Sequence, residues 1–436
     1  MMTEEEKSNR IRVVLAGLQT GQRDEDFARG MAELEQLAEA CGFEPVAVYT
    51  QRAANPVQAT YIGSGKVEEI ASERKLFDAE IVIFDQTLSP MQFRNLNRAL
   101  GVEVMDRTGL ILRIFADQAR TREARLQVEH ARLTYLMPRL AGMWTHLGRQ
   151  AGSSGSRSNR GIGETQLELD RRHIERRMAE LNRELKAITR ERTTQRELRG
   201  RSGIPRIALV GYTNAGKSTI MNRLLELSEN PDPSKRVREE DKVFATLDTT
   251  VRRIRPKGKR PVLVSDTVGF INELPHALVK AFRSTLEEVK YADLLLQVID
   301  YSDPDYRMCM QVTMETLREI GAAAIPMVCV FNKADLIEDP AFSIPAVRHD
   351  SIYMSAGSGI GMQELWELIE QKLKEGTREH LFLVPYEKGG VLHDLQERAE
   401  VLSVDYRPEG TLVHARCSDE IESRYRSFIT AKPPEA

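Results

Sequence analysis

The sequence predicts an α/β protein in four parts: a small N-terminal α/β domain, a helical hairpin, a central domain with a mainly parallel sheet, and a small C-terminal α+β domain. Strand-like apolar runs alternate with helical patterns up to about residue 109 and again from 204 to 375. Residues 110–203 lose the strand signal, and residues 376–436 place two strands in succession. The predicted domain boundaries are therefore 1–109, 110–203, 204–375 and 376–436.

The N-terminal part alternates short runs rich in valine and isoleucine with amphipathic stretches, which predicts a small parallel sheet covered by helices. The predicted strands are Ile11–Leu18, Pro45–Thr50, Ile81–Asp85 and Val102–Met105. The predicted helices are Phe27–Ala40, Lys66–Leu76 and Pro90–Leu100. The Gly-Ser-Gly-Lys run Gly63–Lys66 superficially resembles a phosphate-binding loop, but it lacks the earlier glycine of that motif and is a weak signal.

Residues 110–203 predict two helices joined by a connector. Apolar residues of the second helix follow a heptad spacing, which indicates a seam packed on the first helix. These residues are Leu167, Ile174, Met178, Leu181, Leu185 and Ile188. The connector, Gly148–Gly163, has five glycines, four serines, three arginines and no acidic residue. We interpret it as a flexible basic loop suited to RNA phosphates, with a plain surface connector as the alternative.

Composition excludes several classes of protein. The four cysteines, Cys41, Cys309, Cys329 and Cys417, form no C-x-x-C pair, which argues against a zinc site or a disulfide framework. The first ten residues are polar and acidic, unlike a secretory signal. The longest apolar run, Ile320–Phe331, is too short to span a bilayer and predicts a buried strand. We therefore expect a cytoplasmic protein without a membrane span.

Charge is unevenly distributed along the chain. The net charge is −3, yet residues 120–201 hold 19 Lys/Arg against 10 Asp/Glu. A basic excess of this kind is typical of nucleic-acid partners and also of a solvated helix face, so charge by itself decides nothing.

A phosphate-binding loop follows the first strand of the central domain. Ile207–Val210 predicts a buried strand, and a helix is expected from Thr219 onward. The loop between them reads Gly211, Tyr212, Thr213, Asn214, Ala215, Gly216, Lys217 and Ser218. This is G-x-x-x-x-G-K-S in the strand–loop–helix context of a P-loop NTPase. The loop amides cradle phosphates, Lys217 reaches the β- and γ-phosphates, and the Ser218 hydroxyl can bind Mg²⁺.

Three more motifs follow in the order that a GTP-binding G domain requires. The strand Val262–Asp266 ends in Asp266, Thr267, Val268 and Gly269. A second strand leads into Asn332, Lys333, Ala334 and Asp335, and a third leads into Ser355, Ala356 and Gly357. Asp266 suits the Mg²⁺ shell, and the Gly269 amide can approach the γ-phosphate. Asp335 can accept hydrogen bonds from guanine N1 and N2, whereas adenine would leave its carboxylate unpaired, and the Ala356 amide can bond guanine O6.

The first switch is expected between the P-loop and Asp266. Its motif is Phe244, Ala245, Thr246, Leu247 and Asp248. Thr246 is the candidate for the second protein ligand of Mg²⁺, ordered only when the γ-phosphate is bound, and Thr249 and Thr250 are rival candidates.

The group that orients the attacking water is not evident. The residue after Gly269 is Phe270, which can neither accept nor donate a proton, so we expect slow intrinsic turnover. Asn214 offers one alternative: in potassium-activated relatives an asparagine at this loop position helps to hold K⁺, although it can equally stabilise the loop. The candidate catalytic residues are thus Lys217, Asn214 and Gly269.

At this point the chain resembles the HflX family of bacterial ribosome-associated GTPases over nearly its whole length. Four stretches carry the resemblance: Tyr61–Glu69, Gly161–Glu168, Phe244–Asp248 and Asp266–Ile271. Two positions depart from the family pattern, because Ile162 and Thr249 stand where the family usually has proline. Neither departure removes a phosphate, metal or base contact.

The resemblance implies a function. It implies a GTPase that binds the large ribosomal subunit and its rRNA, with the connector near the peptidyl-transferase centre. The sequence itself gives no sign of oligomerisation, since the helical hairpin explains the heptad seam, so we expect a monomer, with a dimer as the alternative. The resemblance also implies that the GTP-bound form splits stalled ribosomes under stress, and that the N-terminal region binds adenine nucleotides, for which these residues give little support. The alternative from another class is a GTP-gated RNA-binding assembly factor that splits nothing.

Overall fold

The structure is a computed structural model, and it describes residues 10–140, 159–200, 204–229, 250–257, 259–267, 269–270, 288–337, 343–375 and 377–431. Within residues 159–200 the side chains are described from 168 to 191. The predicted first switch, Phe244–Asp248, and the connector up to residue 158 lie outside the described residues. The chain divides into two compact units, which meet in sequence between Ile188 and Thr189.

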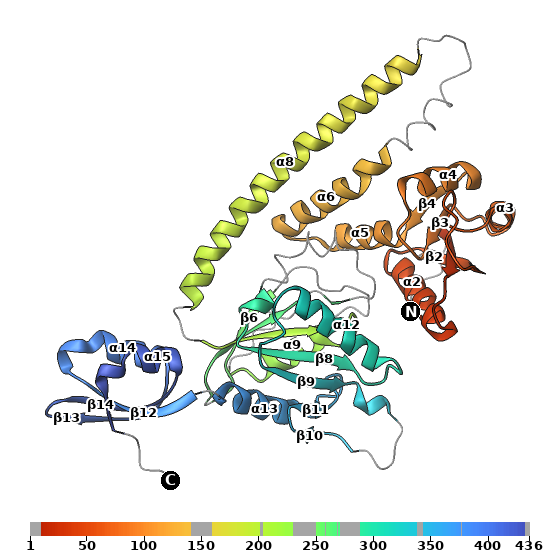
Figure 1. Ribbon diagram of the computed structural model, residues 1–436. Helices are drawn as coiled ribbons and strands as arrows, with labels where there is room; N and C mark the ends of the chain where they lie inside the picture. The colour runs from red at the N-terminus through yellow and green to blue at the C-terminus, as the bar shows by residue number, and fades with distance from the viewer. Residues whose placement is uncertain are drawn as a thin grey trace. The chain divides into compact units, whose positions relative to one another are not determined.

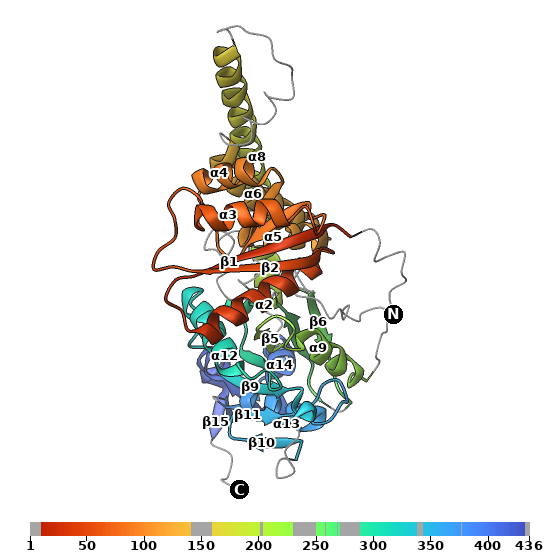
Figure 2. The same cartoon turned by 90° about the vertical axis from the view of Figure 1, so that its right-hand side faces the viewer.

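The first unit begins with a four-stranded, fully parallel sheet in the order β2-β1-β3-β4. Its strands are β1 Arg12–Gln19, β2 Glu44–Arg52, β3 Ile81–Phe84 and β4 Glu103–Asp106. The helices of this region are α2 Asp24–Ala40, α3 Ser64–Glu73, α4 Pro90–Leu100 and α5 Arg107–Gln118. Figure 2 shows α3 and α2 on opposite sides of β1 and β2, as expected for a parallel sheet that buries both faces. The predicted N-terminal α/β fold is confirmed.

The Gly63–Lys66 run begins a helix and contacts β2 and its own first turn. Gly63 is the N-cap of α3, and its N–H donates to the Gln51 side chain at 2.8 Å. The Lys66 ammonium pairs with Glu69 one turn later at 2.8 Å. The Gly63 N–H and the Lys66 ammonium therefore both have protein partners, and neither needs a phosphate.

A helical hairpin completes the first unit. Its helices are α6 Arg122–Leu136, followed by the short η1 Met137–Arg139, and α8 Asn159–Gly200, a single long helix drawn beside α6 in Figure 1. The part of α8 up to Ile188 belongs to this unit. Arg177 binds both carboxylate oxygens of Glu129 at 2.7 and 2.9 Å, and Arg122 binds Glu184 at 2.8 Å, so the helices run antiparallel. Leu181 of the predicted seam is fully buried.

The long helix begins earlier than the sequence predicts. The sequence predicts a connector that reaches Gly163, whereas α8 already includes Asn159–Gly163. Each glycine in a helix costs about 1 kcal/mol relative to alanine, but extending an existing long helix adds one hydrogen bond per residue and tolerates that cost.

The second unit contains a seven-stranded sheet in the order β10-β11-β9-β8-β5-β7-β6. Its strands are β5 Arg206–Gly211, β6 Thr250–Ile254, β7 Val262–Asp266, β8 Leu294–Asp300, β9 Met327–Asn332, β10 Ala346–Arg348 and β11 Ser351–Tyr353. The five inner strands are parallel, and the edge strands β6 and β10 pair antiparallel. The described helices around it are α9 Lys217–Glu226, α12 Tyr306–Glu319, η3 Ala334–Leu336 and α13 Met362–Lys374.

The apolar run Ile320–Phe331 forms a strand only in its second half, because β9 begins at Met327. Gly321 takes a left-handed conformation with φ 76° and ends α12, and Pro326 precedes the strand.

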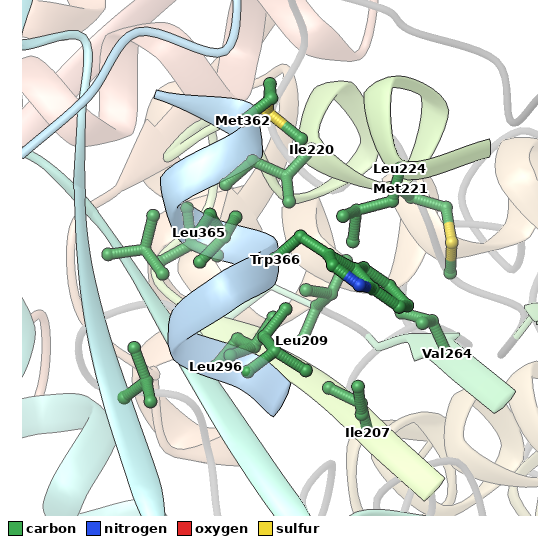
Figure 3. Close-up of a cluster of buried hydrophobic side chains, with 14 of the residues drawn as sticks. Ile207, Leu209, Ile220, Met221, Leu224, Val264, Leu296, Met362, Leu365 and Trp366 are labelled. Carbon is green, nitrogen blue, oxygen red and sulfur yellow. The ribbon is translucent and has the colours of Figure 1, made fainter. Parts of the chain in front are cut away.

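The core of this sheet lies between the strands and two helices. Figure 3 shows Trp366 of α13 lying across the sheet toward Val264, with α9 beside it. Trp366 is 2% exposed, and Ile207, Leu209 and Leu296 of the central strands are fully or almost fully buried below it. This packing fixes α9, and therefore the P-loop that precedes it, against the sheet.

The C-terminal segment folds into a separate four-stranded antiparallel sheet in the order β13-β14-β12-β15. The strands are β12 Thr377–Val384, β13 Glu400–Arg407, β14 Gly410–Ser418 and β15 Ile429–Ala431. The helical segments are η4 Tyr386–Lys388, α14 Gly389–Arg398, α15 Asp419–Arg424 and η5 Arg426–Phe428. The predicted α+β character of this part is confirmed. Among the residues that the structure describes, no helix is long and apolar enough to cross a membrane.

Candidate nucleotide-binding site

The P-loop connects β5 to α9, and both of its glycines are required by its geometry. Gly211 has φ 146°, and a Cβ there would lie 2.2 Å from the Val298 carbonyl oxygen. Gly216 has φ 95°, and a Cβ there would lie 2.2 Å from the Asn332 side-chain nitrogen. A side chain at either position would collide with the strand or the motif beside it. The loop can therefore close tightly enough for its amides to converge.

Lys217, the first residue of α9, lies against its own loop. Its ammonium donates to the carbonyl oxygens of Gly211 at 3.0 Å and Tyr212 at 2.6 Å. The side chain is 6% exposed, and burial lowers the pKa of Lys217 to about 8, while the Asp266 carboxylate partly opposes that shift. The Lys217 ammonium therefore lies inside the P-loop, and phosphate oxygens could replace its two carbonyl partners.

Ser218 and Asp266 meet at the carboxyl end of β7. The Ser218 hydroxyl donates to the Asp266 carboxylate at 2.9 Å, and Asp266 is fully buried. The neighbouring Thr267 hydroxyl donates to the Leu209 carbonyl at 2.7 Å, which ties the two strand ends together. Two hard oxygen ligands therefore lie side by side beside the P-loop, and this donor set fits Mg²⁺. Among the described residues, no cluster of three or more His, Cys, Asp or Glu could hold another metal.

Gly269 and Phe270 pass directly behind the P-loop. The Phe270 N–H donates to the Gly211 carbonyl at 3.1 Å, and its carbonyl accepts from the Thr213 N–H at 2.8 Å. A Cβ on Gly269 would lie 2.8 Å from the Thr213 methyl group. Phe270 is 5% exposed and packs with Ala208 and Val210. Its ring is thus a core residue that holds the switch backbone to the P-loop. Val268 lies outside the described residues.

Asn332 joins the P-loop to the segment after β11, which is the predicted guanine-binding segment Ser355–Gly357. Its side-chain nitrogen donates to the Ala215 carbonyl at 2.9 Å, and its oxygen accepts from the Ala356 N–H at 2.8 Å. The next residue, Lys333, has a left-handed φ of 59° and pairs with Asp300 at 2.6 Å. The structure therefore brings together segments that the sequence separates by more than a hundred residues.

The other residues predicted to contact guanine lie next to Asn332 in sequence or after β11. The Ala334 N–H donates to the Met354 carbonyl at 3.1 Å, so η3 is fixed beside β11. Asp335, the first acidic residue of this segment, is exposed. Ser355 is 1% exposed, and its hydroxyl accepts from the Ser358 N–H at 3.3 Å.

Arg223 is a residue of this site that sequence reasoning missed. From the second turn of α9 it donates to the Ala356 carbonyl at 2.9 Å and to the Gly357 carbonyl at 2.6 Å. It also pairs with Glu226 at 3.0 Å. No local signal could identify it, because its carbonyl partners lie 133 and 134 residues away.

Of the two remaining predicted parts of the site, the structure describes Asn214 but not the first switch. Asn214 is exposed at the tip of the P-loop and has φ 59°, a conformation that asparagine tolerates better than most residues. The first-switch residues Phe244, Ala245, Thr246, Leu247 and Asp248, and also Thr249, lie outside the described residues. Thr250 begins β6 opposite Asp266.

The fold and the site define a P-loop GTPase. Three family descriptions match consecutive parts of the chain: "GTP-binding GTPase N-terminal" over residues 28–116, "GTP-binding GTPase Middle Region" over 118–199, and "50S ribosome-binding GTPase" over 206–333. The chain belongs to the HflX family of GTPases, so it binds guanine nucleotides and hydrolyses GTP, and its GTPase domain is of the ribosome-binding type.

Individual relatives cover almost the whole chain. The GTPase HflX of Caldanaerobacter subterraneus subsp. tengcongensis is 42% identical over 426 residues, which covers 98% of this chain and 95% of the relative. The GTPase HflX of Escherichia coli is 41% identical over 373 residues, 84% of each chain. Among solved structures, a GTP-binding protein from the archaeon Sulfolobus solfataricus in complex with GDP is 27% identical, with a TM-score of 0.43 over 83% of this chain and 99% of that one.

Proposed function

We propose that this GTPase is a Mg²⁺-dependent cytoplasmic monomer that binds the large ribosomal subunit and, with GTP bound, splits stalled ribosomes into subunits. The observation that carries the proposal is the continuous family match through all three segments, which ends in a domain described as ribosome-binding. The helical hairpin of α6 and α8, which lies in the basic region 120–201, gives the chain a second element, besides the GTPase domain, that can contact RNA.

The nucleotide would be held at both ends of the site. Lys217 would exchange its two carbonyl partners for phosphate oxygens, and the Gly269 amide would meet the γ-phosphate. Asp335 would accept from guanine N1 and N2, and the Ala356 N–H would exchange its Asn332 partner for guanine O6. Ser218 and Asp266, with Thr246 from the first switch, would hold Mg²⁺, which when bound neutralises charge on the β- and γ-phosphates.

Water activation has to come from a group other than Phe270, because that side chain is buried in the core. Asn214 is the candidate for positioning K⁺ over the phosphates, since it is exposed at the loop tip. GTP turnover by the purified protein should be faster in KCl than in NaCl, and Asn214→Ala should remove the difference. Equal turnover in the two salts in the wild-type protein would contradict this role.

The splitting activity is tested by sedimentation. Intact ribosomes are mixed with the full-length protein and a non-hydrolysable GTP analogue, next to a variant lacking residues 148–163. Conversion of ribosomes to subunits by the wild type and not by the variant supports splitting and the role of the connector. Binding to one subunit without splitting favours an assembly factor. Absence of binding in every nucleotide state would refute the ribosomal part of the proposal and leave the GTPase assignment intact.

A further inference from the structure

The β6–β7 hairpin, from the second half of β6 through the turn, carries a dense group of basic residues outside the nucleotide site. From Arg252 to Arg260 the chain has six Lys/Arg and no acidic residue. They are Arg252, Arg253, Arg255, Lys257, Lys259 and Arg260. This hairpin directly follows the predicted first switch and leads into Asp266, so it connects the two segments that sense the γ-phosphate.

The backbone of this hairpin is held in place. Ile254 is fully buried and pairs with Val262 in the antiparallel ladder. Beyond the ladder, Pro256 forms a bridge with Ser228 after α9, and the Glu229 N–H donates to the Arg255 carbonyl at 2.9 Å. The turn is thus fastened to both the sheet and α9, and its side chains project from a fixed support.

The six basic residues differ in their surroundings, and Arg252 is half-buried and donates to the Val251 carbonyl at 3.4 Å. Lys259 pairs with Glu370 at 2.7 Å, and Glu400 attracts the Arg260 guanidinium. Arg253, Arg255 and Lys257 are exposed, and among the described residues no carboxylate lies within ion-pairing distance of them. β6 is also the edge strand of its sheet, so no further described strand covers this side. We call Arg253, Arg255 and Lys257 the hairpin triad.

We propose that the hairpin triad binds RNA phosphates and forms a contact between the GTPase domain and ribosomal RNA. Arginine forks match phosphate oxygens, and clustered cations gain affinity by releasing the counterions of a polyanion. A membrane fits less well, because the described residues of the hairpin include no exposed large apolar side chain. This proposal rests on the ribosome association proposed above only for the identity of the RNA.

The experiment compares two variants with the same loss of charge. The first carries Arg253→Gln, Arg255→Gln and Lys257→Gln. The control carries Arg378→Gln, Arg407→Gln and Arg424→Gln, three exposed arginines that each already lie within 4.0 Å of a carboxylate. Binding to purified large ribosomal subunits, with a non-hydrolysable GTP analogue, is measured by pelleting at several salt concentrations.

The triad variant should bind about tenfold or more weakly, and the slope of log affinity against log salt should fall by about two to three. The control should keep the wild-type affinity and slope. GDP affinity and melting temperature should be unchanged in both variants. Equal affinity and slope in the triad variant and the control would overturn the proposal.

A second arm separates this proposal from the ribosomal one. The same proteins are titrated with a short RNA duplex and with polyglutamate. If the wild type binds the duplex through the triad but does not bind large subunits, the RNA contact is supported and the ribosomal function fails. Equal triad-dependent binding to polyglutamate would overturn the assignment to RNA, since it would show general attraction to anions.

Discussion

Arg223 provides a direct test of how the nucleotide site is assembled. It donates to the carbonyl oxygens of Ala356 and Gly357, and so holds the segment whose amide is proposed to bond guanine O6. Arg223→Ala removes both hydrogen bonds and leaves Ala356 bound to the Asn332 side chain and the Gly359 N–H. We expect weaker binding of guanine nucleotides without unfolding of the protein.

The size of the effect follows from the contacts. A hydrogen bond with a charged donor contributes about 1.5–3 kcal/mol. The Arg223 side chain is 35% exposed, so water can replace part of what is lost. We therefore expect a loss of about 1–2 kcal/mol, which is roughly a 5- to 30-fold increase in the Kd for GDP. Arg223→Lys should recover part of the affinity, because one ammonium can reach one carbonyl.

The assay is stopped-flow dissociation of a fluorescent GDP analogue, with unlabelled GDP and IDP as competitors. The loss should be equal for GDP and IDP, because both carry O6, whereas Asp335 alone reads the 2-amino group. Glu226→Gln is the matched control, since it removes the ion pair and leaves both carbonyl contacts in place. Dissociation from Arg223→Ala at the wild-type rate would refute the reasoning.

Three other substitutions test separate parts of the structure. Gly216→Ala places a Cβ 2.2 Å from the Asn332 side-chain nitrogen at a φ of 95°, so GDP affinity measured by calorimetry should fall by more than about tenfold. Asp335→Asn should weaken GDP by about 2–4 kcal/mol and improve xanthosine nucleotides, whose 2-oxo group can accept from the amide; unchanged preference in competition binding would contradict the guanine contact. Leu181→Ala in the fully buried seam of α8 should cost about 2–5 kcal/mol in urea unfolding, whereas Leu169→Ala, 47% exposed, should change stability by less than about 0.5 kcal/mol.

Local sequence patterns are sufficient to predict the P-loop and the N-terminal strands. The P-loop was predictable because its glycines are required by backbone conformation and its lysine and serine by phosphate and metal chemistry, all within eight consecutive residues. The N-terminal strands were also predictable to within about two residues, because both faces of a parallel sheet are buried and its strands are continuous apolar runs. The start of α8 at Asn159 was missed, because glycine composition indicates flexibility more strongly than it indicates a helix end.

By itself the sequence determined which residues can meet a guanine nucleotide, and it showed their order along the chain. Only the tertiary structure decided how those segments are held: Asn332 bridges Ala215 and Ala356, Arg223 fastens the segment after β11, and Phe270 turns into the core. The physical reason is the separation along the chain between the residues that interact. Backbone conformation and apolar periodicity depend on neighbouring residues, whereas a hydrogen bond across more than a hundred residues exists only after the sheet has fixed the order and register of its strands.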